Sequence, residues 1–116
     1  MFDFEKLIAY QKARDVNKKI QKLLVEKKTS VFLRDQLYRA SVSMVINIAE
    51  GTGKLSKNDR KNFYVISRGS VFECASLLEI LHDENSINEN DLNELKLDLE
   101  EVSRLLSGLV NSFIKT

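Results

Sequence analysis

The sequence contains no proline, one cysteine, one histidine and only four glycines in 116 residues. Because proline ends or bends helices, its absence predicts long, uninterrupted helices. A lone cysteine excludes an internal disulfide, and the apolar neighbours of Cys74 predict an inert, buried thiol. A lone histidine, His82, excludes a Cys/His zinc site. We therefore predict no metal, no cofactor and no catalytic residue.

Long hydrophobic runs are also missing. No apolar stretch approaches the roughly 20 residues that span a bilayer, and the first residues, MFDFEKLIAY, carry acids where a signal peptide carries basic residues. Apolar residues make up 43% and charged residues 30% of the chain, which is typical of a globular protein rather than a disordered or membrane one. We expect one domain over residues 1–116 and a cytoplasmic protein without a membrane partner.

Four segments repeat apolar residues every three or four positions, which predicts four amphipathic helices. They cover about residues 4–26, 31–51, 57–83 and 90–113. The predicted core stripes are, in order, Leu7, Tyr10, Ala13, Val16, Ile20 and Leu23; Leu33, Leu37, Ala40, Met44 and Ile48; Phe63, Ile66, Ser70, Glu73, Leu77 and Ile80; and Leu92, Leu95, Leu99, Val102, Leu106, Leu109 and Phe113. Short connections join neighbours, so the predicted fold class is all-α, an antiparallel up-down-up-down four-helix bundle.

The stretch NIAEGTGKLSKND, residues 47–59, resembles a phosphate-binding loop only superficially. A phosphate loop follows a strand and reads GxxxxGK[ST], whereas GTGKLS follows a predicted helix. Gly51 and Gly53 are expected to end that helix in the left-handed conformation. Ser56 and Asp59 have the spacing of a capping box that opens the next one. We interpret the stretch as a corner between two helices.

The second and third helices are apolar on more than one face. The additional residues are Val42, Val45, Ile46 and Ala49 in the second helix and Tyr64, Val65, Val71, Phe72 and Leu78 in the third. A four-helix monomer has too little interior for all of them, so we predict a homo-oligomer that uses these two helices.

Some positions on the predicted core stripes are occupied by polar residues. Folding the second and third helices about residues 53–55 would place Arg39 opposite Ser70 and Gln36 opposite Glu73. A buried carboxylate needs a partner, so we predict a buried Arg39–Glu73 ion pair that sets register rather than performing catalysis.

Charge is distributed unevenly. Residues 1–72 hold 15 Lys and Arg against 7 Asp and Glu, and residues 73–116 hold 3 against 10. Such a division can mark a surface for nucleic acid. It fits equally well a packing of early basic helices against late acidic ones, within a subunit or between subunits.

Together these residues resemble a bacterial family of four-helix-bundle proteins, also labelled S23 ribosomal proteins, whose genes lie in intervening sequences of 23S rRNA genes. The resemblance rests on Leu7, Tyr10, Ala13, Arg39, Ala40, Ser43, the NIAEG run at 47–51, Ser56, Phe63, the Arg68-Gly69-Ser70 run and Glu73. It adds Asn47 and Glu50 to the predicted polar core. The chain is also similar to accessory variability proteins of diversity-generating retroelements, which implies a pentamer that binds nucleic acid and a reverse transcriptase.

Two functional hypotheses remain open. In the first, a non-enzymatic homo-oligomer binds RNA, DNA or a nucleoprotein partner through basic residues, whose side chains neutralise phosphates. The predicted contacts are Lys54, Lys57, Arg60 and Lys61 at the corner and Lys12, Lys18, Lys19 and Lys22 in the first helix. In the second, the chain is a protein-protein scaffold without a nucleic-acid role, and its basic residues meet the acidic fourth helix of a neighbouring subunit.

Overall fold

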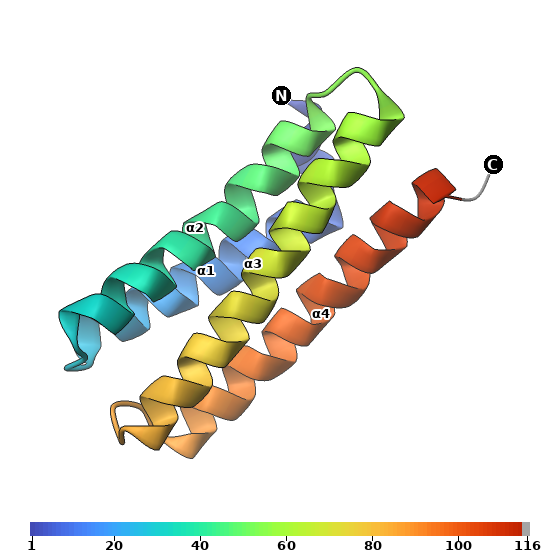
Figure 1. Ribbon diagram of the computed structural model, residues 1–116. Coiled ribbons are helices and arrows are strands. Elements are labelled where there is room, and N and C mark those ends of the chain that lie inside the picture. The colour runs from blue at the N-terminus through green and yellow to red at the C-terminus, as the bar shows by residue number, and fades with distance from the viewer. Residues whose placement is uncertain (115–116) are drawn as a thin grey trace.

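The computed structural model describes residues 1–114, and within them the chain forms a short 3-10 helix and four long α-helices without any strand (Figure 1). The elements are η1 (Asp3–Lys6), α1 (Ile8–Glu26), α2 (Val31–Thr52), α3 (Lys57–Asp83) and α4 (Glu89–Ile114). The all-helical fold class predicted from periodicity is confirmed. The ends of the last three helices lie within a few residues of the predicted ones.

The first predicted helix is interrupted near its start. Leu7 adopts an extended conformation with φ −75° and ψ 128°, so η1 ends before α1 begins at Ile8. Glu5 stabilises this separate turn, because its carboxylate accepts a 2.7 Å hydrogen bond from the backbone N–H of Phe2. The prediction of one continuous helix from residue 4 is therefore wrong at its first turn.

Each long helix packs on two others: α1 and α3 both contact α2 and α4. Figure 1 shows the chain turning back along the bundle at each connection, with η1 and the last turn of α4 near the end that holds the α2–α3 connection. The Ser43 and Ser70 hydroxyls lie 2.9 Å apart between α2 and α3, and Arg68 Nε donates to Ser107 Oγ of α4 at 3.0 Å. The bundle measures 46 × 25 × 21 Å.

The predicted stripes of the first, second and fourth helices do face the interior, but the predicted stripe of α3 is correct only for Ser70 and Leu77, which are buried. Ile66 is 51% exposed and Glu73 is exposed as well. Besides Ser70 and Leu77, the interior face of α3 consists of Tyr64, Ser67, Val71, Cys74, Leu78 and Leu81. Several of these residues belong to the set predicted as a second apolar face. The sequence of α3 is compatible with two orientations of the helix about its axis, because apolar residues occupy both of its sides.

The predicted Arg39–Glu73 ion pair is absent from residues 1–114, and that prediction is wrong for the single chain. Both side chains are exposed, and no ion pair joins them. The physical reason is that α3 is rotated about its own axis from the predicted orientation, so that Glu73 faces solvent. Ser43, rather than Arg39, lies against Ser70.

The remaining polar-core residues divide between interior and surface. Ser70 is buried, Gln36 and Asn47 are half-buried, and Glu50 is exposed, which contradicts its assignment to the core. Asn47 donates to the carbonyl and hydroxyl oxygens of Ser43 at 2.9 and 3.0 Å. A small polar layer thus connects α2 and α3, although it lacks the charged pair that the sequence predicts.

Gly51 is needed for close helix packing rather than for a left-handed turn. Within residues 1–114 no glycine has a positive φ, and Gly53 ends α2 with φ −80° and ψ −9°. A Cβ at Gly51 would lie 2.9 Å from Phe63 Cβ, 3.0 Å from Tyr64 Cε1 and 3.2 Å from the Arg60 carbonyl oxygen. The predicted left-handed cap is therefore wrong, and the glycine instead lets α2 and α3 approach beside the corner.

Candidate nucleic-acid interface

The four basic residues Lys54, Lys57, Arg60 and Lys61, called here the corner cluster, lie on the α2–α3 connection and the first turns of α3. Ser56 caps α3, because its hydroxyl accepts a 3.1 Å hydrogen bond from the backbone N–H of Asp59. Lys57 is the first residue of α3, and Lys61 follows one turn later on the same side of the helix. The predicted corner is thus present, and it gathers the four cations at one end of the bundle.

Two members of the corner cluster also stabilise the corner itself. Arg60 Nε donates to the Lys54 carbonyl oxygen at 2.6 Å, which satisfies a backbone group beyond the end of α2. The Lys54 ammonium lies 4.9 Å from the centre of the Phe63 ring, within cation–π distance. Lys57 is exposed and Lys61 half-buried, and neither makes a side-chain hydrogen bond or an ion pair within the described range 1–114. Lys57 and Lys61 are therefore free to contact a ligand.

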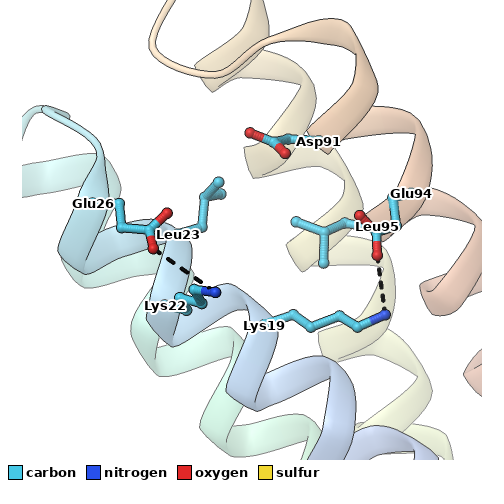
Figure 2. A pocket seen from close by; sticks show the side chains of 7 residues that line it. All are labelled: Lys19, Lys22, Leu23, Glu26, Asp91, Glu94 and Leu95. Carbon is cyan, nitrogen blue, oxygen red and sulfur yellow. Dashed lines mark hydrogen bonds and ion pairs between the residues drawn. The ribbon is translucent and has the colours of Figure 1, made fainter.

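The first-helix lysines behave differently, because two of them are held by carboxylates of α4. Lys12 Nζ lies 3.1 Å from Asp98 Oδ1 and 3.3 Å from Glu101 Oε2. Lys19 Nζ lies 2.8 Å from Asp98 Oδ2 and 3.2 Å from Glu94 Oε1. We call these five residues the α1–α4 seam. Figure 2 shows Lys19 reaching across to Glu94, with Leu23 and Leu95 between the two helices.

The pKa values in the α1–α4 seam are shifted because Lys12 and Lys19 both contact the carboxylate of Asp98. Burial alone would raise the pKa of Asp98, but hydrogen bonds from Lys19 and Lys12 outweigh it and lower that pKa. The same hydrogen bonds raise the pKa of each lysine, and Glu101 and Glu94 add to the effect on Lys12 and Lys19 respectively. The α1–α4 seam holds two ammonium groups against three carboxylates, so it carries no net positive charge where sequence alone predicts a basic surface.

The other two first-helix lysines are more available. Lys22 is 77% exposed and lies 4.0 Å from Glu26 on its own helix, a pair that contributes little (Figure 2). Lys18 is exposed. The eight predicted contacts therefore divide into the corner cluster, two exposed lysines and two lysines whose charge is compensated within the chain. The acidic excess of residues 73–116 is the signal for this compensation, but the individual partners could not be identified from it.

Sequence analysis missed one residue beside the corner cluster. Phe113 of α4 packs against the core with part of its side chain, as its place on the predicted stripe implies, but it also lines a surface cavity together with Lys57, Asn58 and Lys61. No sequence pattern could identify it, because the neighbourhood joins the start of α3 to the end of α4.

Groups suited to other chemistries are scarce in the described part of the chain. Cys74 is fully buried, and burial, with a smaller contribution from the Glu73 charge, raises the pKa of its thiol to about 12, so it is a poor nucleophile. Among residues 1–114 no three His, Cys, Asp or Glu side chains gather as metal ligands. In the same range, none of the helices combines the length and apolar character that crossing a bilayer requires.

Comparison with known proteins agrees with this fold. The family model of the 23S rRNA-intervening sequence protein matches residues 5–108. A crystal structure of a protein of unknown function from the S23 ribosomal protein family of Bacteroides thetaiotaomicron VPI-5482 superposes with a TM-score of 0.84 at 23% sequence identity, over 94% of this chain and 100% of that one. No curated protein matches the chain. Since the family model covers nearly the whole sequence, the chain belongs to the 23S rRNA-intervening sequence protein family.

Proposed function

We propose that this chain is a non-enzymatic, antiparallel up-down-up-down bundle that assembles into a homo-oligomer and binds nucleic acid through the corner cluster. One observation carries the proposal: within residues 1–114 the corner cluster makes no ion pair, whereas Lys12 and Lys19 each contact two carboxylates. Uncompensated lysines and arginines at the end of a rigid bundle are suited to phosphate groups. Contacts of this kind give affinity without base specificity, so both RNA and DNA are expected ligands.

Oligomerisation is supported by apolar side chains that the single chain leaves in solvent. Ile46 of α2 and Val65, Ile66 and Phe72 of α3 are 46%, 50%, 51% and 54% exposed. Arg39 and Glu73 lie on the same two helices, and both are exposed. A second copy that covers these helices would bury the apolar residues and could pair the two opposite charges.

The two parts of the proposal reinforce each other. A pentamer, as the resemblance to retroelement accessory proteins implies, would present five corner clusters to one polyanion. Simultaneous contacts raise the overall affinity well above that of one cluster, provided that the spacing allows them. The same resemblance implies a nucleoprotein partner, such as a reverse transcriptase bound to its RNA.

The experiment is a salt titration with fluorescently labelled RNA and duplex DNA. The variant Lys57→Gln/Lys61→Gln removes the two free cations and keeps Arg60, which the corner needs. Lys28→Gln is the matched control, since Lys28 is exposed on the α1–α2 connection at the opposite end of the bundle (Figure 1). We expect weaker binding and a smaller salt dependence for the double variant only, by about 0.9 in the log-log slope for each duplex phosphate that the variant no longer neutralises.

A scaffold without a nucleic-acid role, in which basic residues meet the acidic α4 of a neighbouring subunit, is the second candidate. The α1–α4 seam supports it only in showing, within one chain, that lysines of this protein pair with carboxylates of α4. The titration separates the two functions. Equal binding by all three proteins, or no binding at low salt, would contradict the nucleic-acid proposal and leave the scaffold.

A further inference from the structure

The cavity beside the corner cluster combines two cations with an aromatic ring. Lys57, Asn58 and Lys61 of α3 form one side, and Phe113 of α4 forms the other. Lys57 and Lys61 are four residues apart, so their backbones are separated by about 6 Å along the helix axis. Two lysine side chains that start one helical turn apart can reach successive phosphates of an extended strand, and the Phe113 ring on the other side of the cavity is available to a base.

The ring of Phe113 packs against a buried aromatic neighbour. Its ring stacks on Tyr64, with the ring centres 6.0 Å apart and the planes 29° apart. Tyr64 is itself only 3% exposed, and its hydroxyl lies 2.8 Å from Thr52 Oγ1 of α2. A ring held in this way loses little conformational entropy when a ligand stacks against it. A base on Phe113 would extend a stack that already contains Tyr64.

We propose that this cavity is a subsite for single-stranded nucleic acid, in which one unpaired base stacks on Phe113 while Lys57 and Lys61 hold the adjacent phosphates. Stacking on aromatic side chains accepts every base, because every base has a π face. The bases of a duplex are covered on both faces by their neighbours, so a duplex can use the lysines but not the ring. Asn58 supplies an amide that can donate to and accept from the edge of the stacked base. This inference rests on the proposed nucleic-acid function and adds the preferred class of ligand.

The test uses a short single strand that contains 2-aminopurine, whose fluorescence falls when it stacks, and a duplex of matched length. Wild-type protein should quench the probe on binding. Phe113→Leu keeps an apolar side chain beside Tyr64, and it should weaken single-strand binding about tenfold and abolish the quenching, with duplex binding unchanged. Phe113→Tyr should restore both. Lys57→Gln/Lys61→Gln should weaken binding of both probes, and Lys28→Gln should change neither.

The outcomes separate this inference from the function on which it rests. Quenching and affinity that are unchanged in Phe113→Leu would overturn the stacking subsite, while weaker binding by the lysine variant would still support the proposed function. Saturated binding by wild type without quenching would overturn the subsite even if Phe113→Leu failed to fold. Wild-type protein that binds neither probe would overturn both.

Discussion

Replacement of Gly51 by alanine tests the close approach of α2 and α3. Two of the three atoms that the new methyl group would meet, Phe63 Cβ at 2.9 Å and the Arg60 carbonyl oxygen at 3.2 Å, cannot move without moving α3 itself. Overpacking of this kind costs about 1–3 kcal/mol. Alanine returns up to about 1 kcal/mol in helix propensity, and less at a helix end. We therefore expect Gly51→Ala to lower the free energy of unfolding by about 1–2 kcal/mol.

The matched control is Gly108→Ala. Gly108 lies inside α4 and is exposed, and a Cβ there would meet no atom within 4 Å. The same substitution should raise stability by about 0.5–1 kcal/mol, because only helix propensity changes. Urea unfolding followed by circular dichroism measures both, and thermal midpoints should move in opposite directions by about 4 °C per kcal/mol. Equal stability of the two variants would refute the close-packing role of Gly51.

Three further predictions concern other parts of the molecule. The pKa of Asp98 is lowered below its ordinary value of 3.8, so its stabilising effect should be present at neutral pH and disappear as the pH falls through the lowered pKa. Asp98→Asn should lower the free energy of unfolding by about 1 kcal/mol at pH 7. The variant should also lose less stability than wild type as the pH falls in acid unfolding experiments, and parallel curves for the two proteins would count against this prediction. Cys74 should not react with a thiol reagent at pH 8 until the protein unfolds, and fast native labelling would contradict its burial. Light scattering should give a mass above that of a dimer for wild type, and a mass near 13.3 kDa for Ile66→Asp with its helix content retained. A wild-type mass near 13.3 kDa would exclude the oligomer, and an unchanged mass in Ile66→Asp would exclude an interface formed by the exposed apolar residues of α2 and α3.

Much of the fold could be predicted because a helix with apolar residues on one face only must turn that face toward the interior. The stripe of α4 from Leu92 to Leu106 is buried as expected, since most residues on its other faces are polar and few apolar residues compete with the stripe. The stripe of α3 could not be predicted in the same way. Its interior includes Ser67, which is fully buried because its hydroxyl donates to the Met44 carbonyl oxygen at 2.6 Å. A polar side chain with such a partner is as well suited to the interior as an apolar one, and the partner lies on another helix.

The candidate site could be predicted only in part, for a similar reason. The residue types and the corner were predictable from the local sequence, because capping and helix punctuation are local effects. Whether a lysine is free or compensated depends on a residue elsewhere in the chain, as Lys12 and Asp98 illustrate. The placement of Phe113 beside Lys57 likewise depends on how the helices pack.

The α1–α4 seam also has a consequence for the order of events during synthesis. Lys12 and Asp98 are 86 positions apart, so the first long helix emerges well before the carboxylates that compensate its charge. Until α4 follows, the part of α1 that will face α4 stays uncovered, and Lys12 and Lys19 stay without their carboxylate partners. Contacts of such large sequence separation are slow to close, so a growing chain carries a temporary cationic surface that disappears once α4 has packed against α1.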